Sequence, residues 1–234
     1  MFAFKDIDED EYNALKEAND GWETEESREI LMQDMSLLAI FGLRDELRPG
    51  VSDTLKKLGD SNTFTRICSG DHEMTVKSLA KELGMDPSND KILIESGEDF
   101  RAMVEPQMKK KRCPETGNMT WVFKDDASVA RFEEYGPRIL MLYRASPEDK
   151  HMLVAGLKGL KARNKMKNIA MTGDSIADAP ALRAADVGMC MEDGCHVAKD
   201  QADFIILDND YRSVFNAAKW GRNIFESVRK FLQF

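Results

Sequence analysis

The sequence lacks the features of a membrane span, a disulfide-stabilised scaffold or a nucleic-acid-binding surface. No apolar run reaches the roughly 18 residues that a membrane span needs. The four cysteines form no CxxC pair, which indicates a reduced, intracellular compartment. The formal net charge of −9 argues against nucleic acid as a partner. The acidic start, MFAFKDIDEDEY, argues against a signal peptide.

What remains is the composition of a soluble globular protein. Its 234 residues are 42% hydrophobic and 32% charged, enough for one or two domains with a substantial core. A metal site at Cys190, Cys195 and His196 would need a second ligand pair, and ordinary thiols are the favoured interpretation. No internal repeat or low-complexity linker interrupts the chain.

Strand and helix patterns alternate along most of the sequence. Acidic, helical segments fill the first 36 residues. Apolar runs then predict buried strands at 36–43, 63–70, 90–97, 138–146, 166–173, 186–191 and 202–208. Helical periodicity predicts helices between them, at 51–60, 72–85 and 147–160. This alternation predicts an α/β fold with a parallel sheet and helices on both faces.

Two further segments are less clear from their pattern. Residues 97–137 are irregular, and their basic run, Lys109 to Arg112, is interpreted as a solvated loop. The tail, residues 212–234, predicts one long helix. Such a helix could lie on a membrane surface, although composition alone favours a helix packed on the domain.

Three loops that follow predicted strands carry groups suited to phosphate chemistry. Ligands of open α/β sheets bind outside the carboxyl ends of the strands. Ser69 and Gly70 offer a hydroxyl and backbone N–H groups, and Lys150 offers a compact cation. Asp174 and Asp178 offer the hard oxygen ligands that Mg²⁺ prefers. Together they predict a site that neutralises a phosphoryl group.

Such chemistry also needs a nucleophile, and only one segment offers an aspartate in a comparable position. Asp6 and Asp8 superficially resemble the DxDx[TV] motif of haloacid-dehalogenase-type phosphatases. However, Lys5 interrupts the apolar run, and Asp10 stands where Thr or Val is needed. A solvated acidic segment is the favoured interpretation.

Five longer segments resemble a known family, the P-type cation-transporting ATPases, and they occur in that family's order. The segments are LLAIFGLRDELRPGV, RICSGDHEMTVKSLAKELGM, LYRASPEDKHMLVAGLK, MTGDSIADAPALRAADVGMCME and WGRNIFESVRKFLQF. The third is similar to the plasma-membrane-type (P2B-like) calcium pumps. The resemblance covers almost all of residues 36–234.

The resemblance implies a fold and a domain organisation. The fold is a haloacid-dehalogenase-like, Rossmannoid parallel sheet whose first strand is missing. Residues 1–35 correspond to the end of the nucleotide-binding domain, 36–211 to most of the phosphorylation domain, and 212–234 to the stalk helix toward the fifth transmembrane helix.

The resemblance also implies catalytic roles for matching positions. Ser69 and Gly70 would contact the phosphoryl group, and Lys150 would neutralise its charge. Asp174 would ligate Mg²⁺, and Asp178 would complete the acidic corner of this metal site.

The implied cofactors are ATP and Mg²⁺. Asp71 and Arg144 would lie near the nucleotide, with Arg48 near its phosphates, and Asp45 would belong to the hinge between the cytoplasmic domains. The implied partners are the rest of a membrane pump, with this segment on its cytoplasmic side, and calcium as the transported ion.

Three departures from the family's motifs bear on activity. The phosphate-acceptor motif DKTGT is absent, so the isolated chain is expected to be inactive. Ser175 stands for a glycine, Ala177 for an asparagine and Glu46 for a proline. Two alternatives remain open: a stand-alone phosphatase that uses Asp6 and Asp8, and a non-catalytic regulatory remnant that binds nucleotide or another pump subunit.

Overall fold

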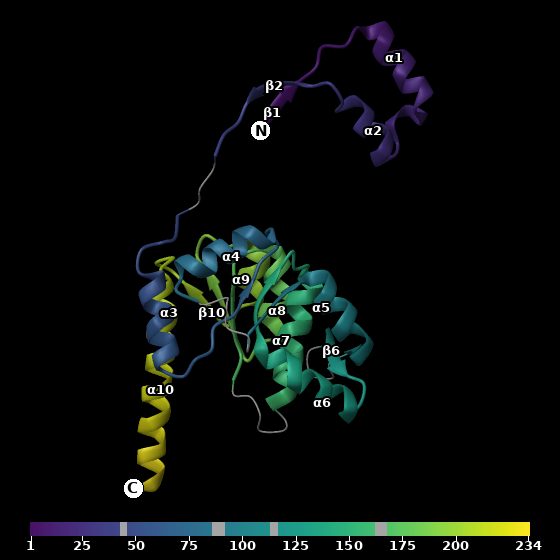
Figure 1. Cartoon of the computed structure of the whole chain (residues 1–234). Helices are drawn as coiled ribbons and strands as arrows, with labels where there is room; N and C mark the ends of the chain where they lie inside the picture. Colours follow the sequence, from purple (N-terminus) through teal and green to yellow (C-terminus); the bar gives the residue numbers. More distant parts are fainter. Residues whose placement is uncertain (43–45, 86–91, 113–116, 162–167) are drawn as a thin grey trace. The chain divides into compact units, whose positions relative to one another are not determined.

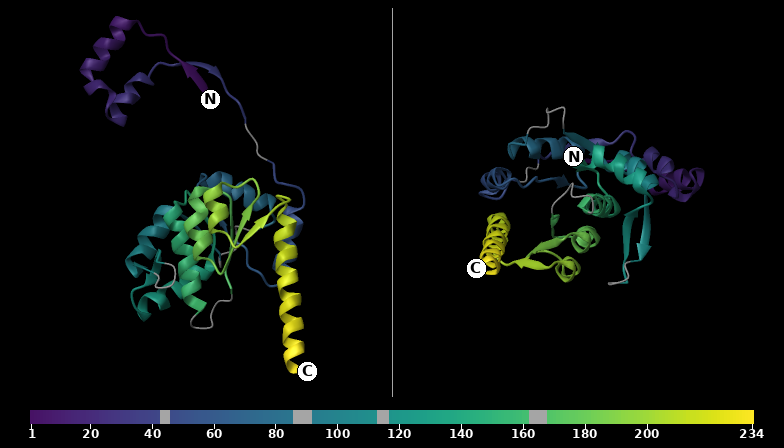
Figure 2. Two further views of the ribbon diagram at one scale, coloured as in Figure 1. Left: turned by 180° about the vertical axis from the view of Figure 1, so that it is seen from behind. Right: turned by 90° about the horizontal axis from the view of Figure 1, so that it is seen from below.

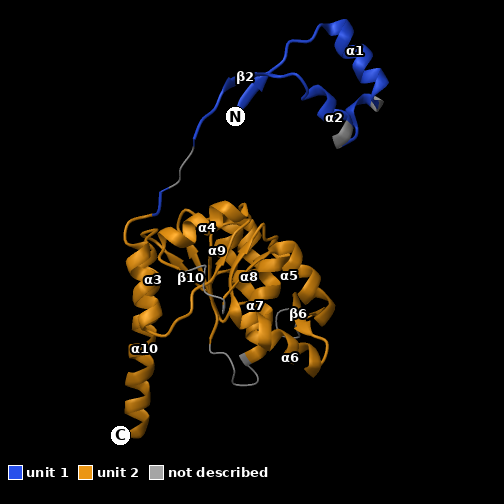
Figure 3. Cartoon of the chain, in the orientation of Figure 1, with its two compact units in different colours: residues 1–47 blue, residues 48–234 orange. Residues whose placement is uncertain are grey.

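The protein is represented by a computed structural model that describes residues 1–42, 46–85, 92–112, 117–161 and 168–234 (Figure 1). It contains two compact units, Met1–Leu47 and Arg48–Phe234 (Figure 3). This division differs from the predicted domain boundary at residue 36. The assignment of these segments to functional domains stays a prediction.

The first unit is small and buries few side chains. Its elements are β1 (Phe2–Phe4), α1 (Glu9–Ala18), the 3₁₀ turn η1 (Asp20–Trp22), α2 (Glu25–Leu31) and β2 (Ser36–Ala39). The two strands pair antiparallel, and the Thr24 hydroxyl caps α2 by accepting from the Ser27 amide at 3.2 Å. The sequence predicts a buried strand here, but Leu37 and Leu38 of β2 are 58% and 69% exposed. That prediction of burial was wrong.

The second unit contains two parallel sheets. The first parallel sheet has the strand order β3 (Ile67–Cys68), β7 (Ile139–Tyr143), β4 (Leu93–Ser96), and the second has the order β8 (Ala170–Gly173), β9 (Val187–Met191), β10 (Phe204–Ile206). All of these pairings are parallel. Within the described ranges β3 pairs only with β7 and β8 only with β9. Among the described strands, β3 and β4 are therefore the edge strands of the first sheet, and β8 and β10 are those of the second.

Helices connect and cover these strands. They are α3 (Val51–Asp60), α4 (Glu73–Glu82), α5 (Gly97–Val104), α6 (Asp126–Tyr135), α7 (Pro147–Lys161), α8 (Ala179–Ala184), α9 (His196–Gln201) and α10 (Tyr211–Gln233), with 3₁₀ turns η2 (Glu105–Gln107), η3 (Gly136–Arg138) and η4 (Ile176–Asp178). The prediction of an α/β fold with parallel strands is confirmed.

The central strand of each sheet is covered on both faces. Met141 of β7 packs with Val76 and Ala80 of α4, whereas Leu142 packs into a separate cluster formed by α5, α6 and α7. On β9, Cys190 packs with α8 and α9, and Met189 packs with β10 and α10. Alternate residues of a strand point to opposite faces, so these strands lie in the middle of a three-layer core.

Residues 97–137 are more regular than their sequence indicated. They form α5, an antiparallel hairpin of β5 (Met108–Arg112) and β6 (Met119–Phe123), and α6. The basic run predicted as a loop is strand β5. The Lys110 ammonium lies over the Trp121 ring, 5.0 Å from its centroid, and this cation–π contact helps to hold a highly charged strand in place.

The long helix predicted for the tail is confirmed as α10. Its first turn packs into the core through Val214, and it contacts α3, where the Arg222 guanidinium donates to the Ser61 carbonyl and the Thr63 hydroxyl at 3.1 Å each. Its C-terminal part extends away from the unit (Figure 2). Among the described residues, no helix combines the length and apolarity that crossing a bilayer requires.

Candidate functional site

Three loops meet at the carboxyl ends of the parallel strands. Ser69 follows β3, Lys150 lies in the first turn of α7 after β7, and Asp174 follows β8. Backbone bonds join the first two loops: the Ala145 amide donates to the Ser69 carbonyl, and the Arg144 amide donates to the Asp71 carbonyl, both at 2.9 Å. The predicted loops therefore lie on one edge, as strand direction requires.

A buried ion pair joins α7 to the loop after β8. The Lys150 ammonium donates to Asp178 Oδ1 at 2.8 Å, and the two side chains are only 11% and 8% exposed. A lysine and a carboxylate removed from water must be paired, because an unpaired buried charge is costly. This contact joins the first turn of α7, which follows β7 in the first parallel sheet, to the loop that follows β8 in the second.

The other oxygen of Asp178 organises the loop after β8. Asp178 Oδ2 accepts from the Ser175 hydroxyl at 2.7 Å, and from the amides of Ser175 and Asp174 at 3.3 and 3.4 Å. Burial alone would raise the pKa of Asp178, but the hydrogen bonds from Lys150 and Ser175 outweigh it and lower that pKa below its ordinary value. Asp178 is thus held as a carboxylate, with both oxygens engaged.

Gly173 is needed for this close approach. A Cβ built at Gly173 would lie 2.5 Å from the Asp178 Cβ, a separation that real side chains do not adopt. The glycine before Asp174 therefore lets the Asp178 carboxylate reach the backbone of its own loop.

Asp174 differs from Asp178 because its side chain is exposed. Its backbone carbonyl accepts from the Cys195 amide at 2.8 Å, so the loop after β9 holds the loop after β8. In the part of the chain that the structure describes, no group of three or more His, Cys, Asp or Glu is placed to hold a metal ion. A magnesium ion here would therefore need further oxygen ligands from other molecules or segments.

The Ser69 loop is folded on itself. The Ser69 hydroxyl donates to Asp71 Oδ2 at 2.7 Å and accepts from the Asp71 amide at 3.1 Å. The neighbouring Cys68 is partly buried, and this desolvation raises its thiol pKa to about 12, while the charges of Lys150 and Asp178 also act on this thiol. The end of β3 therefore lies within electrostatic reach of the Lys150–Asp178 pair.

Two of the three residues predicted to bind nucleotide lie together, because the Arg144 amide donates to the Asp71 carbonyl. Arg144 lines a pocket, and Asp71 is bonded to Ser69. Arg48 instead donates to the Asn209 carbonyl at 2.5 Å, at the base of α10. Asp45, the predicted hinge residue, lies outside the described residues.

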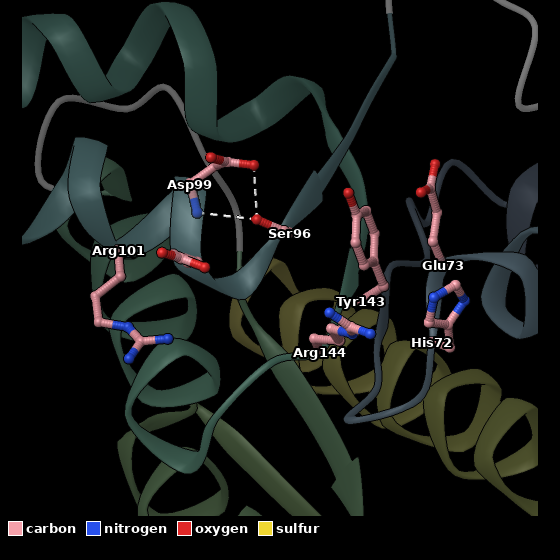
Figure 4. Close-up of a pocket in the computed structure, with 8 residues that line it drawn as sticks. His72, Glu73, Ser96, Asp99, Arg101, Tyr143 and Arg144 are labelled. Atoms are coloured by element: carbon pink, nitrogen blue, oxygen red, sulfur yellow. Dashed lines mark hydrogen bonds between the residues drawn. The ribbon is translucent and has the colours of Figure 1, made fainter. Parts of the chain in front are cut away.

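The pocket beside Arg144 was not predicted as a whole. It has a volume of about 420 Å³ at the carboxyl ends of β4 and β7 and is lined by His72, Glu73, Ser96, Glu98, Asp99, Arg101, Tyr143 and Arg144 (Figure 4). Its lining mixes three carboxylates with two guanidinium groups, so it does not select an anion by charge alone. The small residues Ser96 and Gly97, where β4 passes directly into α5, were the sequence signal that could have indicated it.

A second buried carboxylate was also missed. Asp149 is fully buried and accepts a two-pronged interaction from Arg101, at 3.0 and 3.2 Å, together with the Ser146 amide at 2.8 Å. It fixes α5 against the start of α7, and thereby supports the turn that presents Lys150.

A nucleophilic aspartate would need to lie at the carboxyl end of a strand in a parallel sheet, and Asp6 and Asp8 do not lie there. They follow β1, which belongs to the antiparallel pair of the first unit rather than to a parallel sheet. Asp8 precedes α1, and its side chain forms no capping hydrogen bond. The strand-end placement on which the phosphatase alternative depends is therefore not found.

Comparison with known proteins identifies the class. Residues 3–186 match the haloacid dehalogenase-like hydrolase family, and the chain belongs to this family. It is similar to a plasma membrane calcium-transporting ATPase of Caenorhabditis elegans, mca-1, with 34% identity over 98% of this chain and 17% of that protein. The human plasma membrane calcium-transporting ATPase 1 is 32% identical over 91% of this chain and 16% of that protein.

A solved structure supports the same fold. A zinc-transporting PIB-type ATPase in its E2.Pi state superposes with a TM-score of 0.50, at 21% identity, over 80% of this chain and 21% of that chain. The predicted resemblance to P-type ATPases of the plasma-membrane calcium type is confirmed. The chain spans about a sixth of the length of the curated relatives that it matches.

Proposed function

We propose that this chain is the phosphorylation-domain segment of an ATP-driven, calcium-transporting P-type ATPase, working on the cytoplasmic side of a membrane. The observation that carries the proposal is the buried Lys150–Asp178 pair, at 2.8 Å, between two motifs that are 28 residues apart in sequence. Charge arranged in this way, at the carboxyl edge of parallel strands, is suited to a transferring phosphoryl group.

In this proposal each residue has a distinct task. Lys150 neutralises phosphoryl charge, and Ser69 and Gly70 orient the phosphoryl oxygens. Asp174, exposed and without a side-chain partner among the described residues, ligates Mg²⁺. Both oxygens of Asp178 are already engaged, so it acts as a positioning residue that holds Lys150 and shapes the metal-binding loop.

Magnesium, when bound, would supply positive charge to the phosphoryl oxygens, and ATP would be the phosphoryl donor. Asp71 and Arg144 are the proposed nucleotide contacts, with Arg48 assigned to the phosphates. In the domain assignment proposed here, residues 1–35 end the nucleotide-binding domain, 36–211 form the phosphorylation domain and 212–234 form the stalk.

The proposal needs an acceptor aspartate from elsewhere in the pump, because the sequence contains no DKTGT. The unpaired edges of β3 and β8 support this requirement. Each belongs to a parallel sheet, and each precedes one of the proposed catalytic loops. Strand edges in a protein core need a partner for their backbone N–H and C=O groups. A further strand between them would satisfy both edges.

A chimeric pump tests the proposal. This chain replaces the matching segment of human plasma membrane calcium-transporting ATPase 1, and the chimera is incubated with labelled ATP, Mg²⁺ and calcium. We expect an acid-stable phosphoprotein in the chimera and none in the isolated chain. Lys150→Ala and Asp174→Asn should abolish the label, whereas Lys77→Ala, on the exposed surface of α4, should retain it.

A specific observation favours a second candidate, a non-catalytic segment that binds nucleotide without turnover. The Ser175 hydroxyl donates to an oxygen of Asp178, and Ala177 has no side-chain amide where the resembled motif has asparagine. If a well-expressed chimera stays unlabelled while Ser175→Gly with Ala177→Asn restores the label, this second candidate replaces the first. Label on the isolated chain that Asp6→Asn removes would instead support a phosphatase.

A further inference from the structure

Two cysteines flank the loop that holds Asp174 in place. Cys190 lies on β9 and is fully buried, and Cys195 is the N-cap residue of α9 and is partly exposed. Only four residues separate them, and both pack in the apolar cluster that contains Leu182 and Ala198. Neither thiol has a role in the function proposed above.

The loop between the two cysteines folds back onto the Cys190 thiol. A Cβ built at Gly194 would lie 2.6 Å from Cys190 Sγ, so the backbone that leads into Cys195 passes directly over this sulfur. Only glycine permits this approach. The same built atom would lie 3.2 Å from the Asp174 Cα, which brings the thiol, the loop and the Asp174 backbone to one place.

Cys195 has two structural tasks, one for its backbone and one for its sulfur. Its amide donates to the Asp174 carbonyl at 2.8 Å. Its Sγ accepts from the Ala198 amide at 3.4 Å and so caps α9. A change at this sulfur therefore acts on a residue that directly holds the Asp174 loop.

We propose that Cys190 and Cys195 form an oxidisable pair, which hydroperoxides convert to an intramolecular disulfide that disturbs the Asp174 loop. This inference goes beyond the proposed function, because it depends only on the positions of the two thiols and of the Asp174 carbonyl.

The chemistry balances with one equivalent of peroxide. The more exposed sulfur, Cys195 Sγ, loses its proton and attacks a peroxide oxygen, which forms a sulfenic acid and releases water when hydrogen peroxide is the oxidant. Cys190 Sγ then attacks the Cys195 sulfur, its proton leaves with the hydroxyl as a second water, and the disulfide forms. The two thiols together lose two electrons, and the peroxide gains them.

Disulfide formation withdraws the Cys195 sulfur from its capping position on α9. Both thiols are free in this structure, and their sulfurs must approach to about 2.05 Å, so we expect the loop between them to move. We expect the hydrogen bond from the Cys195 amide to the Asp174 carbonyl to weaken, so that oxidation loosens the backbone of the proposed metal-binding loop.

The test uses the full chain with Cys113→Ser, so that three thiols remain. The reduced protein is treated with one equivalent of hydrogen peroxide and mapped by peptide mass spectrometry. We expect a loss of two hydrogens, a Cys190–Cys195 linkage that dithiothreitol reverses, and an unmodified Cys68. The raised pKa of Cys68, about 12, makes it the internal reference thiol.

Amide hydrogen exchange connects the linkage to the loop. Oxidation should increase exchange in the peptide that spans residues 171–178 by severalfold. Cys195→Ser, which keeps a capping oxygen, and Cys190→Ala should both remove this response to peroxide. The idea is overturned if Cys68 or an intermolecular dimer oxidises first, or if the disulfide forms without a change in exchange at 171–178.

Discussion

The first parallel sheet packs against buried aromatic side chains, whereas the described side chains buried against the second are aliphatic or contain sulfur. Phe100, Phe132, Leu142 and Met152 are fully buried in the cluster against β7. The clusters against the second sheet are instead built from Val154, Ala181, Leu182, Ala185, Met189, Cys190, Ala198, Ile206 and Val214. Burial of apolar area is the main source of folding stability. Packing against the first sheet should therefore contribute more of this stability than packing against the second.

Polar contacts partly compensate in the second sheet. The Asp186 carboxylate accepts from the Ile169 amide at 2.9 Å, and the Asp203 carboxylate accepts from the Gly188 amide at 2.8 Å. The Lys150–Asp178 pair joins this sheet to α7. The region with the exposed Asp174 is thus held by directional bonds, which fix geometry, more than by apolar packing.

The largest effect should come from truncating the first cluster. Phe132 is fully buried, and its ring centroid lies 5.4 Å from that of Phe123. Phe132→Ala should lower the free energy of unfolding by about 3–5 kcal/mol, as measured by urea denaturation. Phe132→Leu, which keeps most of the apolar volume, should cost less than about 1.5 kcal/mol. Equal losses in the two variants would contradict this account of the cluster.

A smaller effect should follow from breaking the buried ion pair. Lys150→Met leaves the Asp178 carboxylate buried with only its own loop as partner, and we expect a loss of about 1.5–3 kcal/mol. The pKa of Asp178, followed by NMR titration, should rise because its main partner is gone. Adding Asp178→Asn should recover part of the loss. Strict additivity of the two substitutions would show that the pair contributes no coupling energy.

The smallest effect concerns pH and a residue of α7. Burial, and secondarily the charge of Arg183, lowers the pKa of His151 below its ordinary value of 6.5. At a pH between the lowered pKa and 6.5, His151 is protonated in the unfolded chain and neutral in the folded chain. Stability should therefore be complete above about pH 6.5 and decline as pH falls through the lowered pKa.

Urea midpoints between pH 8 and pH 5 measure this decline, and His151→Gln should flatten it. The pKa of Asp178 is lowered from 3.8, so its contribution is lost only at more acidic pH and does not overlap with this window. An unchanged pH dependence in His151→Gln would assign the decline to other groups.

The sequence predicted those parts of the fold in which a local pattern and the tertiary environment agree. Strands β7 and β9 are continuous apolar runs and are buried on both faces, so their composition indicates their position. The loops that carry Lys150 and Asp178 were predicted to meet because parallel strands end at the same edge. The direct bond between these two side chains depends on how α7 packs, which no local pattern encodes.

Other features depend on tertiary contacts that override local pattern. Strand β5 is a run of cations that pairs with β6 and is held partly by the Lys110–Trp121 contact, which single-residue preference cannot anticipate. Arg101 and Asp149 are far apart in sequence, and their pairing was not predicted. The bond from Arg48 to the base of α10 was not predicted either, and its assignment to nucleotide phosphates stays a prediction.

Helix α10 is held at its start and near its middle, so small rotations at these contacts move its C-terminal end. It is fastened near its start by Val214 in the core and, further along, by Arg222 bonded to the end of α3. A helix of 23 residues is about 34 Å long. About 17 Å of helix extends beyond Arg222, so a tilt of about 5° at that contact would displace Gln233 by about 1.5 Å and would carry small movements beside α3 to the end of the helix.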